Sequence, residues 1–77
     1  MPVIVYSTSA CPWCVKVKEF LKQNNVTFED RNVGEDAESL QEMEEKSGQR
    51  GVPVIDVNGV IITGFDRDAL KAALRLR

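Results

Sequence analysis

The 77-residue sequence predicts an α/β fold: a four-stranded mixed sheet flanked by three helices, in the order β-α-β-α-β-β-α. Three observations support this fold class. Apolar runs of strand length alternate with segments of helical period. Residues 3–33 read as strand, helix and strand, which form a right-handed βαβ unit. The pair Asn58-Gly59 then joins two further apolar runs as a hairpin.

The first strand and the first helix follow one another closely. Residues 3–6 form an uninterrupted apolar run, which is typical of a central strand covered on both faces. The apolar spacing then predicts a helix over residues 12–24, with Val17, Phe20 and Leu21 on its buried face.

The second strand is expected at an edge of the sheet. Asn24-Asn25 ends the first helix, because asparagine tolerates the left-handed conformation that follows a helix. Residues 26–33 then form the strand. Its apolar residues are interrupted by Glu29, Asp30 and Arg31, and charged side chains commonly protect an exposed strand edge.

The second helix is predicted over residues 37–47, between a cap at Asp36 and a stop at Gly48. Because few of its residues are apolar, we expect it to be the most exposed of the three helices. Its apolar stripe consists of Ala37, Leu40 and Met43.

The C-terminal part predicts a hairpin and a last helix. Pro53 stands at the entrance of an apolar run that ends at Val57, where a proline can begin a strand. The hairpin partner is residues 60–63. Asp66 caps a helix from residue 67 to about residue 76. The residues expected to face inward are Leu70, Ala73 and Leu74.

Composition limits the possible functions. We expect one domain over residues 1–77, since nothing in the chain resembles a linker or a repeat. The net charge of -2 and the scattered lysines argue against a nucleic-acid-binding surface. The apolar runs are too short to span a membrane. Met1-Pro2-Val3 shows no basic leader, so we expect a cytoplasmic protein. We also expect it to be a monomer.

The segment Cys11-Pro12-Trp13-Cys14 lies where the first strand gives way to the first helix. Two cysteines at this spacing are typical of a redox-active disulfide rather than a structural one. Both sulfurs fall on the first turn of the helix, close enough to bond without much strain.

Disulfide exchange needs a thiolate, and an ordinary cysteine with a pKa of about 8.5 is mostly protonated at neutral pH. The free N–H groups and positive dipole at a helix start favour an anion there. Pro12 suits the first helical position because it has no N–H to leave unpaired. We therefore predict Cys11 as the attacking thiol and Cys14 as the resolving thiol.

A structural disulfide and a zinc site are the two other interpretations of the cysteine pair. A structural disulfide closing so short a loop would remove little entropy from the unfolded chain. A zinc site needs four nitrogen or sulfur ligands, and the chain has 2 cysteines and no histidine, so we predict no metal site.

The pattern resembles the glutaredoxins, the shortest members of the thioredoxin fold. The resemblance covers nearly the whole chain and rests on four segments. These are Tyr6-Ser7-Thr8, Cys11-Pro12-Trp13-Cys14, Gly51-Val52-Pro53 and Thr63-Gly64-Phe65-Asp66. A thioredoxin-like (glutaredoxin) fold is therefore expected.

The resemblance implies a substrate site beside the cysteines. The Val52-Pro53 bond would be cis, presenting the backbone of Val52 to an extended thiol substrate. Gly64, Phe65 and Asp66 would hold the γ-glutamyl end of glutathione. Arg50 could hold its glycyl carboxylate, and Trp13 would offer a contact surface for partners.

Three positions depart from the glutathione-binding pattern. Thr8 stands where such members usually carry a lysine, Gly51 replaces a threonine, and Thr63 replaces a glycine. The Gly64-Phe65 pair also resembles small redoxins that accept electrons from thioredoxin reductase and serve ribonucleotide reductase. The sequence is therefore compatible with reduction by glutathione and with reduction by thioredoxin reductase.

We predict a thiol–disulfide oxidoreductase with no permanently bound cofactor, glutathione as co-substrate, and disulfide-containing proteins as substrates. The first alternative is reduction by thioredoxin reductase, with ribonucleotide reductase as one electron acceptor. The second is an iron–sulfur module, in which a cluster is bridged between two subunits by Cys11-type thiolates and glutathione; Pro12 disfavours it.

Overall fold

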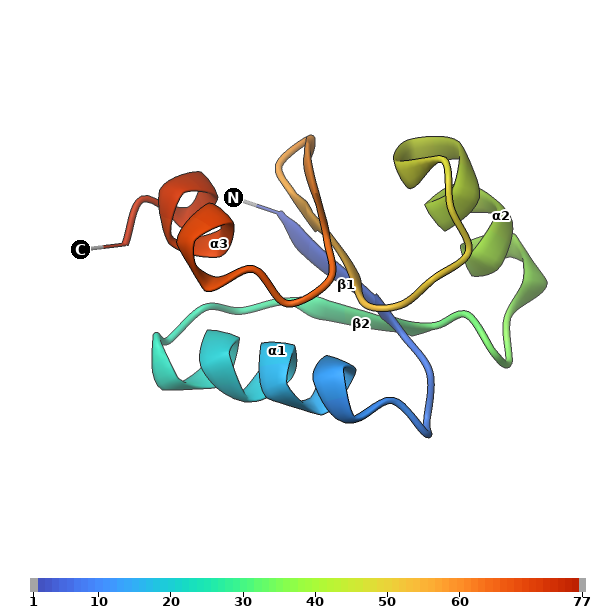
Figure 1. Cartoon of the computed structure of the whole chain (residues 1–77), viewed down its shortest axis with the longest axis horizontal. Helices are drawn as coiled ribbons and strands as arrows, with labels where there is room; N and C mark the ends of the chain where they lie inside the picture. The colour runs from blue at the N-terminus through green and yellow to red at the C-terminus, as the bar shows by residue number, and fades with distance from the viewer. Residues whose placement is uncertain (1, 77) are drawn as a thin grey trace.

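The computed structural model describes residues 2–76, and these form four strands and three helices in the predicted order. Figure 1 labels β1 (Val3–Ser7), α1 (Pro12–Gln23), β2 (Glu29–Asn32), α2 (Ala37–Ser47) and α3 (Arg67–Leu74). The hairpin consists of β3 (Val54–Val57) and β4 (Val60–Thr63). Met1 and Arg77, which the predicted domain includes, lie outside the described residues.

The sheet has the strand order β2-β1-β3-β4. β1 pairs in parallel with β2 and antiparallel with β3, and β3 pairs antiparallel with β4. The central position of the first strand and the edge position of the second are therefore confirmed. The turn between β3 and β4 has positive φ angles of 50° at Asn58 and 94° at Gly59, as the Asn-Gly signal predicts.

Helices cover both faces of the sheet, with α1 and α3 on one face and α2 on the other (Figure 1). Alternation along β1 separates two cores: Val3 and Val5 pack with α1 and α3, whereas Tyr6 packs with Met43 of α2. None of the helices in residues 2–76 has the length and apolar character that crossing a bilayer requires.

Two predicted element bounds need correction. The predicted strand 26–33 shortens to β2, because the N–H of Val26 bonds to the carbonyl of Leu21 and closes α1 instead of joining the sheet. α3 ends at Leu74 rather than near residue 76, since Arg75 takes a left-handed conformation with a φ of 58°.

The inward face of α2 is more polar than predicted. Ala37 is exposed, and Ser39 is buried in its place, donating a hydrogen bond to the cap residue Asp36 at 2.6 Å. Met43 is fully buried, as predicted, and Leu40 is half-buried. The predicted apolar face does not include Ala37, because this first residue of α2 is exposed to solvent.

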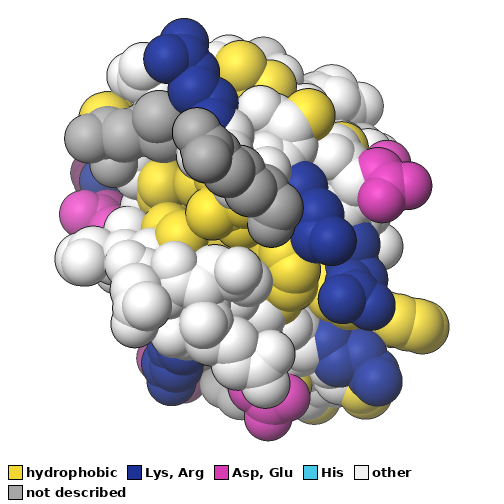
Figure 2. All heavy atoms as spheres, turned by 90° about the vertical axis from the view of Figure 1, so that its left-hand side faces the viewer, with side chains coloured by type: hydrophobic (Ala, Val, Ile, Leu, Met, Phe, Trp, Pro, Cys, Tyr) yellow, Lys and Arg dark blue, Asp and Glu magenta, His cyan; other side chains and the backbone are white. Residues whose placement is uncertain are grey.

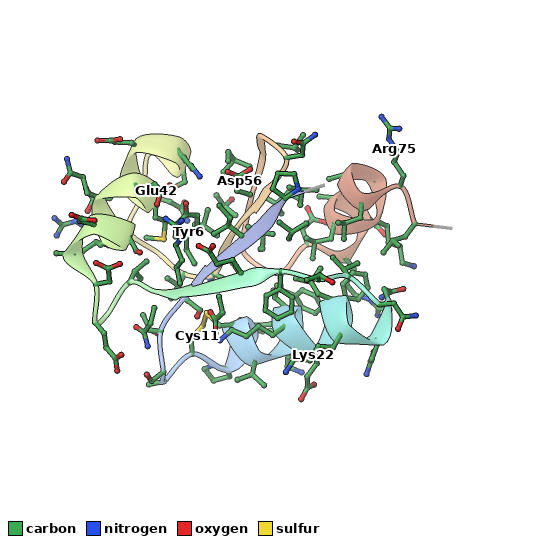
Figure 3. All side chains as sticks on the ribbon, turned by 180° about the vertical axis from the view of Figure 1, so that it is seen from behind. Tyr6, Cys11, Lys22, Glu42, Asp56 and Arg75 are labelled. Atoms are coloured by element: carbon green, nitrogen blue, oxygen red, sulfur yellow. A yellow bond between two sulfur atoms is a disulfide. The ribbon has the colours of Figure 1, made fainter. Side chains whose placement is uncertain are left out.

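A partly buried polar network joins α2 to the sheet. The ammonium of Lys46 donates to the hydroxyl of Tyr6 at 2.8 Å and to Oδ2 of Asp56 at 2.7 Å. Asp56 also accepts the N–H of Gly59 at 2.7 Å. Figure 3 shows the labelled Tyr6 and Asp56 on the side of the sheet that carries α2, away from Cys11. The network therefore stabilises the fold at a distance from the cysteines.

Candidate redox site

The cysteine pair lies at the N-terminus of α1, where Figure 3 labels Cys11. Cys11 is the residue that caps this helix, and its Sγ accepts the N–H of Cys14 at 3.1 Å. Pro12 occupies the first helical position, as predicted. A disulfide joins the two sulfurs across a Cα–Cα distance of 5.2 Å. The helix start thus provides an N–H donor to the sulfur of Cys11.

The two cysteines differ in their access to solvent. Cys11 is half-buried, whereas Cys14 is fully buried beneath the first turn of α1. Cys14 shares its helix face with Val17 and Leu21, which follow it by three and seven residues, so the core packing of α1 covers it. An incoming disulfide can therefore reach Cys11, while Cys14 is within reach of Cys11 alone.

A shallow hollow of about 260 Å³ opens beside the pair. Its floor includes the Val52-Pro53 segment, and the bond between these two residues is cis, as the family resemblance implies. The N–H of Gly64 bonds to the carbonyl of Pro53 at 2.9 Å, which joins the two segments. The lining residues are Trp13, Val52, Pro53, Gly64 and Phe65.

Two aromatic rings form one side of this hollow. The ring of Trp13, whose side chain is 57% exposed, lies 6.3 Å from the ring of Phe65 between centroids. Such a separation is within the range of favourable aromatic pairs. The structure therefore brings five of the predicted site residues together around one apolar hollow.

Asp66 and Arg50 lie outside the lining of that hollow. Asp66 caps α3, as predicted, through a 3.0 Å hydrogen bond that Oδ1 accepts from the N–H of Ala69. Arg50 is exposed, and its guanidinium pairs with Glu44 of α2. Asp66 directly follows Phe65, which does line the hollow.

Polar side chains of β2, which the sequence analysis missed, hold the segment that leads to Cys11. The hydroxyl of Ser7 donates to Oδ1 of Asp30 at 2.7 Å, and the amide of Asn32 donates to the hydroxyl of Ser9 at 3.0 Å. Lys18 of α1 bonds to the other oxygen of Asp30 at 2.7 Å. In the sequence, the only indication of these contacts is that Asp30 and Asn32 alternate along the strand and therefore point to the same face.

The described residues offer little for a metal ion. Within residues 2–76, no three side chains of the His, Cys, Asp or Glu type are grouped closely enough to hold one. The chemistry that the arrangement supports directly is sulfur exchange at Cys11, followed by closure of the bond to Cys14.

A cysteine pair that opens the first helix of this sheet, beside a cis-proline loop, defines a thiol–disulfide oxidoreductase of the thioredoxin-like fold. The family model for glutaredoxin matches residues 3–62, so the chain belongs to the glutaredoxin family.

Sequence relatives agree with this assignment. A glutaredoxin-like 8.6 kDa protein of Clostridium pasteurianum, described as part of a rubredoxin operon, is 51% identical over 63 residues, covering 82% of this chain and 84% of the relative. Glutaredoxin-C6 of Oryza sativa is 46% identical over 68 residues; the alignment covers 84% of this chain and 61% of the rice protein.

Two solved structures agree as well. The glutaredoxin of Archaeoglobus fulgidus has a TM-score of 0.86 at 31% identity, covering 95% of this chain and 85% of that one. The thioredoxin-like protein BC3987 has a TM-score of 0.87 at 34% identity, covering 92% of this chain and 97% of that one. The sequence-based prediction of fold and family is therefore confirmed.

Proposed function

We propose that the protein is a glutathione-dependent disulfide oxidoreductase in which Cys11 attacks and Cys14 resolves. The observation that carries this proposal is the unequal burial of the two sulfurs: Cys11 is accessible, and Cys14 is not. Only an accessible thiolate can attack a disulfide on another molecule, and a buried thiol nearby is restricted to attack within the same molecule.

The reaction begins with attack of the Cys11 thiolate on one sulfur of the substrate disulfide. A bond from Cys11 to that sulfur forms, and the second substrate sulfur leaves as a thiolate and takes a proton. Cys14, after losing its proton, attacks Sγ of Cys11 and releases the first substrate sulfur. The substrate disulfide has been reduced to two thiols, and the Cys11–Cys14 pair has been oxidised.

Glutathione is the proposed reductant of the Cys11–Cys14 bond. One glutathione thiolate opens the bond and forms a mixed disulfide with Cys11, and a second releases oxidised glutathione. The hollow beside the pair suits a small thiol peptide, with the Val52 backbone along its cysteinyl part. We propose that Gly64, Phe65 and Asp66 bind its γ-glutamyl end and that Arg50 swings from Glu44 to its glycyl carboxylate.

A specific observation keeps thioredoxin reductase as the second candidate for the electron source. The hollow is lined mostly by apolar side chains, and Thr8, Gly51 and Thr63 depart from the glutathione-binding pattern. A small redoxin that draws electrons from thioredoxin reductase and donates them to ribonucleotide reductase or other proteins would need the same cysteine pair without a strong anion site.

Two coupled assays on the full chain separate these candidates. Reduction of a small neutral disulfide is followed with glutathione and glutathione reductase in one, and with thioredoxin reductase in the other. The proposal expects turnover in the first assay, and turnover in the second alone would contradict glutathione dependence. Cys11→Ser should abolish both activities, whereas Cys14→Ser should accumulate mixed disulfides at Cys11. Full activity of the Cys11→Ser protein would overturn the catalytic assignment.

A further inference from the structure

A second hollow of about 220 Å³ adjoins the one beside the cysteines, and Phe65 lines both. It lies between α1 and the start of α3. The residues that line it are Lys16, Glu19, Phe20, Gln23, Phe65 and Arg67. A path therefore leads from the redox pair over Phe65 and along the outside of α1.

Three aromatic rings line this path. The ring of Phe65 lies 6.3 Å from that of Trp13 and 6.0 Å from that of Phe20, measured between centroids. Laid end to end, the two separations are a little shorter than four extended residues at ~3.4 Å each, and their sum is the upper limit for the length of the path. The path therefore has room for a short extended peptide that continues beyond a cysteine bound at Cys11.

Cations stand above the rings at both ends of the path. The ammonium of Lys16 lies 5.5 Å from the centre of the Trp13 ring, and the guanidinium carbon of Arg67 lies 5.8 Å from that of Phe20. Among the described residues, a carboxylate partner within 4 Å is found for Lys18, Arg31, Lys46 and Arg50. Within that part of the chain, Lys16 and Arg67 have none; the same is true of Lys22, Lys71 and Arg75, but those three do not line the hollow. These two cations are thus available to an acidic ligand.

Figure 2 views the side of the molecule on which α3 lies. Lys and Arg side chains gather there in a row along one edge, beside a protruding hydrophobic side chain. Glu19 is the acidic residue in the lining of the second hollow, and its charge offsets part of the positive charge of Lys16 and Arg67. The lining of this hollow therefore carries two cations and one carboxylate, in a molecule with a formal net charge of -2.

We propose that this path binds a substrate polypeptide, in extended form, that carries Asp or Glu within about four residues of its reactive cysteine. The inference rests on the proposed function, because the substrate cysteine is placed by its bond to Cys11. Trp13 and Phe65 contact the peptide backbone and apolar atoms, beside the largely buried ring of Phe20, and Lys16 and Arg67 pair with the peptide's carboxylates. The path thereby selects among protein disulfides.

The test measures single-turnover reduction of peptide disulfides by the reduced full-length protein. Three peptides are identical except for the residues after the reactive cysteine, which are Glu-Glu, Gln-Gln or Lys-Lys. Two exposed charge contacts predict a three- to tenfold faster reaction of the Glu-Glu peptide than of the Gln-Gln peptide at low salt. The ratio should approach one at about 0.5 M salt, where exposed charges are screened.

Charge reversal supplies the variant and a matched control. The double variant Lys16→Glu, Arg67→Glu should invert the preference, so that the Lys-Lys peptide reacts fastest. The double variant Lys22→Glu, Lys71→Glu makes the same change in net charge on the same two helices, at exposed residues outside the hollow. It should keep the wild-type preference. Lys16→Gln with Arg67→Gln, a milder change, should bring the ratio near one if the reversed variant fails to fold.

The outcomes separate the docking path from the chemistry. Equal rates for the three peptides with the wild-type protein overturn the inference, and so does an identical loss of preference in both reversed variants. If the reversal of Lys16 and Arg67 instead raises the KM for glutathione and leaves peptide preference unchanged, the hollow binds glutathione and the inference is wrong. If the wild-type protein reduces none of the peptides and no small disulfide, the proposed function itself fails.

Discussion

Replacing Lys46 by methionine should destabilise the fold without touching the redox site. Methionine keeps the length of the side chain and removes the ammonium, which donates to the Tyr6 hydroxyl and to Asp56. The side chain of Asp56 is only 12% exposed, so water replaces the lost partner poorly. Asp56 keeps one donor, the N–H of Gly59.

The size of the effect follows from these contacts. Leaving a buried hydrogen-bonding group without its partner costs about 1–3 kcal/mol, and more for a charged group. Breaking a fully buried ion pair costs about 3–5 kcal/mol. Lys46 is 27% exposed and Asp56 retains Gly59, so we expect a loss of about 2–3 kcal/mol in the free energy of unfolding. In a domain of this size, that lowers Tm by roughly 10–20 °C.

Urea denaturation at pH 7 measures the loss of stability. Lys22→Met is the control, because Lys22, like Lys46, lies on a helix, but it is exposed.

The dependence of stability on acid pH gives a second test. Burial raises the pKa of Asp56, but hydrogen bonds from Lys46 and the Gly59 backbone hold it below 3.8. This carboxylate therefore contributes stability above about pH 4, and the contribution is lost as pH falls through the lowered pKa.

The difference between the wild-type protein and Lys46→Met should accordingly shrink below about pH 4, because Asp56 becomes protonated in both proteins. Surface substitutions usually change the free energy of unfolding by less than about 0.5 kcal/mol. A loss that small for Lys46→Met at pH 7, equal to the loss for Lys22→Met, would refute the reasoning. A difference that stays constant down to pH 2 would show that the ammonium stabilises the fold by some route other than Asp56.

Two further predictions concern the alkaline limit and the cap of α3. Burial raises the pKa of Tyr6, and the pKa of Lys46 is also raised, since bonds to Asp56 and Tyr6 outweigh its burial. Both groups hold their protons more tightly in the folded state, so unfolding by urea should become easier as pH rises above about 10. Asp66→Ala should cost about 1 kcal/mol of stability and Asp66→Asn much less, because asparagine is also a good cap. If Asp66 binds the ammonium of glutathione, Asp66→Asn should still raise the KM for glutathione; an unchanged KM would leave it a cap alone.

The element order was predictable because each element carries its own local signal. Helical spacing in α1, the Asn58-Gly59 turn and the Asp66 cap depend on neighbours in sequence, and the structure confirms all three. The inward face of α2 was harder to predict. Lys46 points to the sheet because its ammonium donates to Tyr6 and Asp56 there. Both of these residues belong to strands that are far from Lys46 or separate from its helix in the sequence, so no local pattern indicates the contact.

The same distinction applies to the site. The cysteine spacing is a local motif that can be recognised without a relative, whereas the role of the Val52-Pro53 segment followed from the resemblance to the glutaredoxins. The contributions of Asp30 and Asn32 depend on the parallel register of β1 and β2, in which Ser7 lies opposite Asn32. That register is set by tertiary packing, and an isolated charged strand gives no indication of which residues it will contact.

The two open edges of the sheet have unequal protection against joining another chain. β2 presents Glu29, Asp30 and Arg31, and a foreign strand pairing there would have to bury their charges. The opposite edge, β4, carries Val60, which is 53% exposed, and no acidic or basic residue. At high concentration, sheet-to-sheet aggregation should therefore begin at β4, and a lysine at position 60 is the substitution that would most directly suppress it.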